Sequence, residues 1–281
     1  MNKMKFMMLV ASIVAAVSVE AQTVRVAYDA VTPKAGEKEG VSITKMLLDA
    51  DATHSLYYNA ISLFCDSLTS TPEGEKQLKE MQFAAFVKVQ PDGSIVIDKT
   101  DKSVPNKIID LYVAKDNGAA VTTLYDKLAD ASVYYTEPFD ELSWNIVEDS
   151  TMTVLGYECV MAEAEYHGRK WTAWFSPEIP VHDGPWKLRG LPGLILMASA
   201  TPEIYFTATE VGQTASGVPA MYKTDTYYKA DRRKTLSDDE HYQNHRMTML
   251  KAKYAGVKVV GGSGGDEVNV IKDRHALETD Y

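Results

Sequence analysis

His241 and His245 are the residues whose type and spacing most directly offer chemistry. Residues four positions apart lie on one face of a helix, so the two imidazoles can reach one transition metal. The segment reads His-Tyr-Gln-Asn-His and lacks the Glu that serves as base in a zinc-protease helix. No third ligand is identifiable, and natural sites seldom rest on two ligands. We therefore expect surface histidines with no metal or cofactor, and keep the pair only as a candidate.

Cys65 and Cys159 are the only two cysteines of the chain. An even number of cysteines in an oxidising compartment favours a disulfide. A bridge between them would close a long loop and stabilise the fold by about 4 to 5 kcal/mol in the chain-entropy model. The alternative is that both are buried free thiols.

Nucleophilic catalysis finds little support in the sequence. There is no Gly-x-Ser-x-Gly elbow, and Ser176, His182 and Asp183 are neighbours without the spacing of a known triad. Neither a phosphate-binding loop nor a dinucleotide fingerprint occurs. The catalytic residues, if any, stay unknown. An enzyme remains the alternative, namely a hydrolase or metal-dependent enzyme whose residues converge only in three dimensions.

Aromatic and basic side chains gather in one part of the chain: Arg169, Trp171, Trp174, Trp186, Lys187 and Arg189. Aromatic rings beside cations can form a surface for a ligand or a protein partner. Packing in the core is the alternative for these residues. We expect the charges of Lys187 and Arg189 to be solvated, so that their replacement by Ala leaves folding nearly intact.

Segment 184–196 combines backbone constraint with apolar burial. Its centre is the run Gly190, Leu191, Pro192, Gly193, Leu194 and Ile195. Glycine at 190 and 193 predicts either a positive φ or a close approach to a neighbouring strand. The apolar residues that follow predict a strand buried on both faces. We interpret the segment as an architectural element that also borders a binding site.

These six residues also carry a family resemblance. Together with Gly156, Tyr157, Cys159, Ala162, Arg169, Ala173–Phe175, Ile179, Pro180, Gly184 and Pro185, they match in order and spacing the GLPGLI family of secreted bacterial proteins. The chain resembles this family over about fifty residues, from Trp144 to Leu196. The family has no established activity, so the resemblance implies a secreted protein of unknown molecular function.

The N-terminus and the overall charge indicate where the protein acts. Residues 1–21 have the Lys-rich start, apolar middle and small-residue end of a signal peptide cleaved near Ala21. We expect a secreted or periplasmic product without lipid anchor or membrane span. A net charge of −10 argues against nucleic acid and anionic membranes as partners. An unknown ligand or an envelope protein is the expected partner, which favours a binding or envelope-assembly protein.

Short β-branched and aromatic runs predict a mainly β fold: a curved antiparallel sheet or partly open β-barrel in one domain, 22–260. The strongest local prediction is a hairpin over Tyr157–Ser176 with a two-residue turn at His167-Gly168. Strands are also expected over 54–65, 83–89 and 107–114. Helices are expected over 72–81 and, after the Ser237 capping box, 238–255. A Gly-rich linker and polar tail, 261–281, complete the chain.

Overall fold

The computed structural model describes residues 23–33, 40–91, 93, 95–97, 101, 103–139, 142–201, 203–253 and 277–281. The predicted signal peptide, the Gly-rich linker and most of the polar tail lie outside these residues. In the part that is described, no helix has the length and apolar character needed to cross a membrane.

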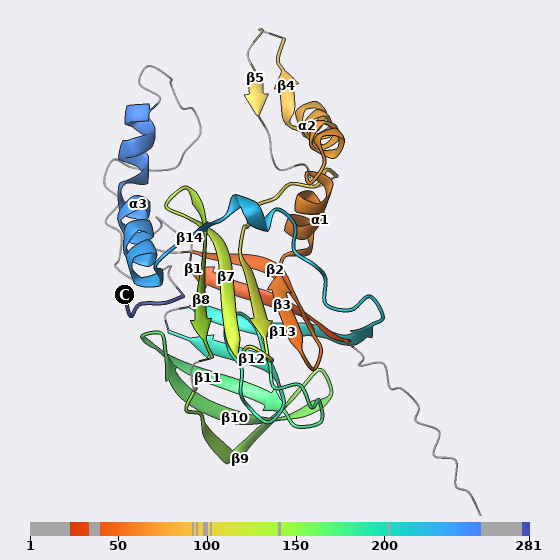
Figure 1. The fold of residues 1–281 in the computed structure, drawn as a ribbon, viewed down its shortest axis with the longest axis vertical. Coiled ribbons are helices and arrows are strands. Elements are labelled where there is room, and N and C mark those ends of the chain that lie inside the picture. Colours follow the sequence, from red (N-terminus) through yellow and green to blue (C-terminus); the bar gives the residue numbers. More distant parts are fainter. Residues whose placement is uncertain are drawn as a thin grey trace, which may run out of the picture.

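A single sheet of twelve strands dominates the molecule (Figure 1). Its order is β14-β8-β7-β6-β3-β2-β1-β13-β12-β11-β10-β9, and every pair is antiparallel except β14 with β8. The sheet curves strongly and its two edge strands do not pair, so the prediction of a curved, open, mainly antiparallel sheet is confirmed. The strands are β1 (Thr23–Pro33), β2 (Val41–Ala50), β3 (His54–Tyr58), β6 (Tyr112–Asp116), β7 (Val121–Leu128), β8 (Ala131–Pro138), β9 (Asn145–Val154), β10 (Tyr157–Tyr166), β11 (Arg169–Ser176), β12 (Leu194–Ala200), β13 (Ile204–Thr214) and β14 (Tyr228–Lys229).

The predicted hairpin is β10 and β11, and its register is confirmed. Glu165 pairs with Lys170 and Met161 with Trp174, as the two-residue turn requires. His167 and Gly168 both have positive φ, 49° and 76°, which matches the right-handed twist of the flanking strands.

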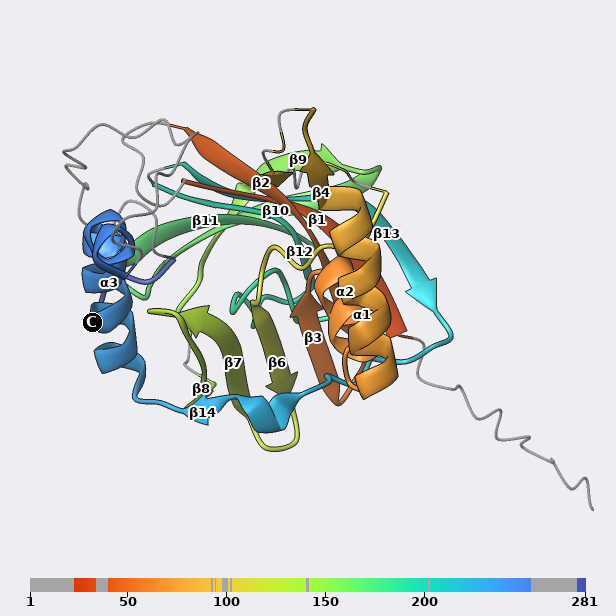
Figure 2. The same cartoon turned by 90° about the horizontal axis from the view of Figure 1, so that it is seen from above.

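The concave face of the sheet holds the main core. Tyr28, Leu48, Trp171 and Phe206 point into it from four different strands and are almost fully buried. The segment between β11 and β12, residues 177–193, lies inside the curve and fills it (Figure 2). Because this segment contains the Gly-Leu-Pro-Gly run, we call it the signature loop.

At two places the structure has a helix where the sequence predicted a strand. Strand β3 ends at Tyr58, and α1 (Ala60–Leu68) follows where strand was expected to continue to Cys65. The reason is Asn59, whose side chain accepts a hydrogen bond from the Ser62 amide and caps a helix. Helix α2 (Pro72–Phe86) starts at the Thr71 cap as predicted but runs five residues past Met81, so only Val87–Val89 of the expected strand is β4.

Strands β4 and β5 (Ile95–Ile97) form a separate two-stranded sheet at the end of α2, which projects from the main sheet (Figure 1). The strand predicted over 107–114 begins only at Tyr112. A short 3-10 helix, η1 (Thr224–Thr226), lies on the path from β13 to β14.

The late helix is confirmed as α3 (Arg232–Lys253), but it starts six residues before the predicted Asp238. The Asp231 side chain accepts a hydrogen bond from the Lys234 amide at 2.9 Å, which is cap geometry. Ser237 is therefore inside the helix and not at its start.

Candidate functional site

The predicted aromatic surface is largely core. Trp171 and Trp186 are fully buried and stack with ring centroids 5.5 Å apart, while Trp174 is half-buried. Trp171 also stacks on Phe206, 5.9 Å away. The expectation that Trp171 and Trp186 offer a binding surface is wrong, because the signature loop folds Trp186 into the concave face of the sheet.

Arg169 and Lys187 are also buried, and the prediction that the Lys187 charge is solvated is wrong. Arg169 donates to the Thr201 carbonyl at 2.7 Å. The Lys187 ammonium forms ion pairs with Glu137 and with Glu278, the latter at 2.6 Å, and lies 4.7 Å from the Tyr135 ring centroid.

The partner of Lys187 comes from the end of the chain. Residues 277–281 pack against the turn of the β10–β11 hairpin, where the Thr279 amide donates to the His167 carbonyl at 2.9 Å. Arg232 of α3 pairs with Glu278 and Asp280. This last part of the predicted polar tail is thus ordered by a buried charge network, which we call the terminal network: Glu137, His167, Lys187, Arg232, Glu278 and Asp280.

His167, Glu278 and Asp280 place three potential metal ligands within 4.8 Å of one another. However, Arg232 lies 2.8 Å from His167 Nδ1 and pairs with both carboxylates. The cationic guanidinium occupies the position a metal would need. Burial would raise the pKa of Glu278, but Lys187, His167 and Arg232 lower it overall. The cluster acts as an internal salt-bridge network.

His241 and His245 lie on the exposed surface of α3 with ring centroids 4.3 Å apart. His245 Nδ1 is 2.8 Å from the His241 carbonyl oxygen. Among the described residues, no other His, Cys, Asp or Glu forms a group of three with this pair.

Cys65 and Cys159 are both free and both buried, so the structure has the second of the two alternatives, the buried free thiols, and not the candidate disulfide. Cys65 lies in α1, beside β3, whereas Cys159 lies in β10 near the other edge of the sheet. Five strands stand between β3 and β10 in the sheet order, far beyond the Cα separation of about 7 Å that a bridge tolerates. Burial raises the pKa of both thiols.

The glycines of the signature loop have the predicted structural roles. Gly190 has a φ of 88°, which is unfavourable for any residue with a Cβ. A Cβ on Gly193 would lie 2.1 Å from the carbonyl oxygen of Ser176, so only glycine permits this approach of loop and strand. Leu191, Leu194 and Ile195 are fully buried, while Pro192 is exposed. The prediction of an architectural element is confirmed.

A buried ion pair ties the signature loop to the sheet. Lys115 of β6 is fully buried, and its ammonium pairs with Asp183 and donates to the Gly184 carbonyl at 3.1 Å. Burial lowers the pKa of Lys115, and the attraction of Asp183 opposes this shift. With Ser176 buried and Asp183 taken by Lys115, the neighbouring Ser176, His182 and Asp183 form no triad.

Next to this ion pair, at one end of the curved sheet, is a cavity of about 1010 Å³. We call it the mouth cavity. The first half of the signature loop lines it, including His182 and Asp183, together with the ends of β1, β2 and β13. Asn117 and Phe139, after β6 and β8, complete it beside Arg189.

Of the predicted binding residues, only Arg189 lines the mouth cavity. Its guanidinium lies over the Phe139 ring at 3.3 Å from the centroid and donates to Asn117 Oδ1 at 3.3 Å. Sequence reasoning missed Asn117 and Phe139, whose only local signal is their position at turns after strands.

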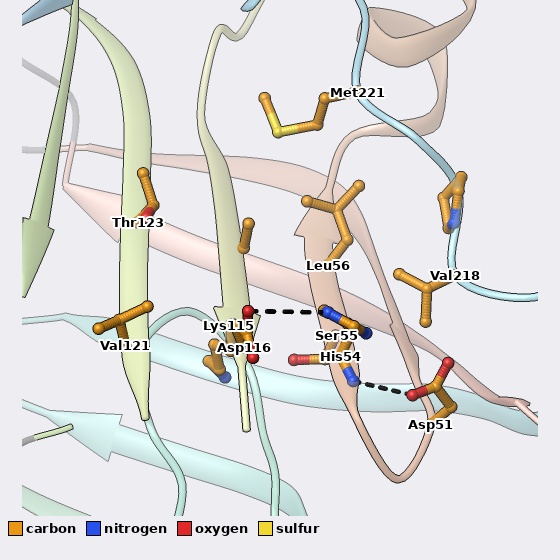
Figure 3. Close-up of a pocket in the computed structure, with 12 residues that line it drawn as sticks. Asp51, His54, Ser55, Leu56, Lys115, Asp116, Val121, Thr123, Val218 and Met221 are labelled. Atoms are coloured by element: carbon orange, nitrogen blue, oxygen red, sulfur yellow. Dashed lines mark hydrogen bonds and ion pairs between the residues drawn. The ribbon is translucent and has the colours of Figure 1, made fainter. Parts of the chain in front are cut away.

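A second cavity, about 430 Å³, lies on the convex face between the sheet and residues 218–221. Figure 3 shows it bordered by His54, Leu56, Asp116 and Met221. His54 Nε2 is 3.8 Å from Asp116 Oδ2, and Leu56 packs with Tyr112 in a small separate core. Its polar groups pair with one another, and it is the smaller of the two cavities.

A family model described as "Protein of unknown function (Porph_ging)" matches residues 160–197. The match covers most of the β10–β11 hairpin, the signature loop and the start of β12. None of the curated proteins matches this chain.

Two solved structures are similar to this chain, both of PNGF-II, in space groups C2 and P21. Their TM-scores are 0.48 and 0.47, at 11% and 12% sequence identity. The similarity covers 80% of this chain but only 34% of PNGF-II, so this chain spans about a third of that protein's length.

Proposed function

We propose that this is a binding protein of the bacterial envelope, secreted or periplasmic and related to the GLPGLI family, and that its ligand occupies the mouth cavity. The observation that carries the proposal is the cavity itself. About 1010 Å³ is the volume of a small-molecule site, and the mouth of a curved sheet is a common place for one. The N-terminal signal pattern and the Gly-Leu-Pro-Gly-Leu-Ile run support the location and the family.

The construction of the wall supports the same proposal. Lys115 forms a buried ion pair with Asp183 of the signature loop, and Gly193 packs directly against the Ser176 carbonyl. These contacts favour a cavity wall that is already formed before a ligand binds. A preformed site binds more tightly because less conformational entropy is lost on binding. The constrained loop therefore serves both as core filling and as a fixed ligand-binding wall.

This proposal can be tested with a substitution that fills the cavity. Gln213 is exposed on β13 and lines the mouth cavity, so Gln213→Trp places an indole there without opening the core. Native mass spectrometry of the protein purified from its own host should show a retained small molecule in the wild type and none in Gln213→Trp. The matched control, Gln213→Ala, removes the same amide without filling the cavity and should retain the molecule.

Equal retention by Gln213→Trp and the wild type would contradict the proposal, since the molecule would then sit elsewhere. A wild-type protein that carries only an associated protein chain would favour envelope assembly over small-molecule binding.

A further inference from the structure

Arg189 is the one Lys or Arg among the described residues that line the mouth cavity, and the fold holds its guanidinium in place. Within the described part of the chain no carboxylate lies within ion-pair distance of it. Its recorded contacts are the Phe139 ring and the Asn117 side-chain carbonyl oxygen. An arginine has five N–H donors in a planar fork, so most of them stay open for a ligand.

The fold fixes the direction of this group. The Trp144 indole donates to the Arg189 carbonyl at 2.9 Å, and Arg189 forms an isolated antiparallel bridge with Asp183. Stacking on Phe139 then orients the guanidinium plane. Because backbone and side chain are both held, Arg189 is preorganised to receive a planar acceptor.

The three carboxylates that line the cavity accept hydrogen bonds or form ion pairs with other groups of the protein. Asp183 pairs with Lys115 and accepts from the Gly184 amide at 2.7 Å. Asp51 accepts three hydrogen bonds from Thr53 and His54, between 2.7 and 2.8 Å. Glu178 Oε1 accepts from the Glu158 amide at 2.8 Å.

The charges immediately around Asp183 do not balance. Lys115 and Arg189 contribute two positive charges around the single negative charge of Asp183. Burial lowers the pKa of Arg189, and the attraction of Asp183 only opposes this in part. A partly buried charge without its own counter-ion is costly, and a bound anion would remove that cost.

Apolar side chains also line the cavity. Val24, Val181 and Val211 line the cavity and are each only half-buried, and Ile179 lies beside them. Such residues leave apolar surface in contact with solvent that a ligand of matching character would cover. The cavity thus offers both a cation and apolar surface to a ligand.

We propose that the ligand of the mouth cavity is a carboxylate carried on an apolar body, with its carboxylate held by Arg189. This rests on the proposed function, because it assigns the ligand class of the same cavity. Val24, Val181 and Val211 cover the apolar part.

Isothermal titration calorimetry of the full chain tests this with four probes: octanoate, its neutral analogue octanamide, octylamine and acetate. Octanoate should bind at least about tenfold more tightly than octanamide, as expected for a charge-assisted hydrogen-bonded pair. Octylamine should bind most weakly. Acetate should bind far more weakly than octanoate because it lacks the apolar body.

Arg189→Gln should remove the preference for octanoate over octanamide, while Arg189→Lys should keep part of it. Lys170→Gln, which removes an exposed cation from β11 away from the cavity, should leave the preference unchanged. Thermal unfolding of each variant shows that a lost preference does not reflect a lost fold.

The two proposals fail in different ways. If octanamide or octylamine binds as well as octanoate, and Gln213→Trp abolishes that binding, the anion assignment is overturned while the mouth cavity stands as the site. If octanoate keeps its preference in Gln213→Trp and Arg189→Gln, both proposals are overturned. Failure of octanoate to bind at millimolar concentration overturns the ligand class, and the native mass spectrum then decides the site.

Discussion

Lys187 and Arg189 are two residues apart in the same loop, and the fold uses their charges in opposite ways. Lys187 is 1% exposed and pairs with Glu137 and Glu278, which come from β8 and from the end of the chain. Arg189 is half-buried beside a cavity and has a ring and an amide as neighbours. Lys187 is paired within the fold, whereas Arg189 has no carboxylate partner among the described residues and is the residue to which we assign the ligand.

The difference shows that the role of a charged residue in the signature loop depends on its partners in the folded protein. A buried, paired charge is costly to break, because removal of one partner leaves the other uncompensated. A charge without a carboxylate partner at a cavity wall costs little stability to remove and can contribute to binding. Each of the following predictions tests this contrast.

The largest effect is expected from the loop that holds both cations. Gly193→Val should destabilise the protein by more than about 4 kcal/mol, because a Cβ there collides with the Ser176 carbonyl oxygen at 2.1 Å. Gly190→Ala is the matched control. It meets no atom within 4 Å and carries only the positive-φ penalty of about 1 kcal/mol. Denaturant unfolding of both variants measures the difference, and similar midpoints would rule out the close-approach argument.

Lys187→Met should cost about 3 to 5 kcal/mol, because Glu137 and Glu278 lose a buried partner. The double variant Lys187→Met, Glu278→Gln should recover part of that loss, since it removes one of the stranded charges. Chemical unfolding of the two single variants and the double variant gives the coupling. Strict additivity would mean that the two residues do not interact in the folded protein.

The terminal network should make stability depend on pH. Burial is the main cause that lowers the pKa of His167 below its ordinary value of 6.5, and the pKa of Glu278 is held below 4.5. The unfolded chain therefore binds more protons than the folded chain below each ordinary value, so stability falls as pH drops. The first loss should begin below about pH 6.5 and the second below about pH 4.5.

Melting temperatures from pH 8 down to pH 4 measure this dependence. In a plot of melting temperature against pH, His167→Gln should reduce the loss that begins below about pH 6.5, and Glu278→Gln should reduce the loss that begins below about pH 4.5. Stability that rises on acidification in the wild type would show that the network does not hold these protonation states.

The smallest effect on stability is expected at Arg189. Arg189→Gln should change the free energy of unfolding by less than about 1 kcal/mol, which is the usual value of a partly exposed cation–π contact. We therefore keep the expectation that replacing the side chain leaves folding nearly intact for Arg189, and we abandon it for Lys187. A loss as large as that of Lys187→Met would erase the contrast and point to a structural role for both.

Elements with a local cause were predictable. The β10–β11 register follows from the two-residue turn at His167-Gly168, and α2 begins at the Thr71 cap. Helix α1 was missed because the apolar spacing over 54–65 also suits a strand, although Asn59 was a usable cap signal. The start of α3 was misplaced because two cap sequences, at Asp231 and Ser237, compete over six residues.

The candidate site was predictable only in part. Arg189 was identified from its place beside the signature residues, but Asn117 and Phe139 come from loops that the sheet brings to it. The burial of Trp186 could not be read from its neighbours, since Pro185 and Lys187 on either side are typical of a surface turn. Its indole fills the concave face only because β11 and β12 flank the loop that carries it.

By itself the sequence determined the turns, the alternation of the strands and the need for glycine at 190 and 193. The turns and the alternation depend on steric limits and hydrogen bonds among residues close in the chain. Glycine at 193 was predictable from its type, but the strand residue that it approaches, Ser176, was identified only in the folded structure. Only the tertiary structure decided which cation is buried, because the carboxylates of Glu137 and Glu278 lie 50 and 91 positions from Lys187. Long-range electrostatic partners are set by topology, and a charge that topology leaves without one, as at Arg189, is where a ligand can bind.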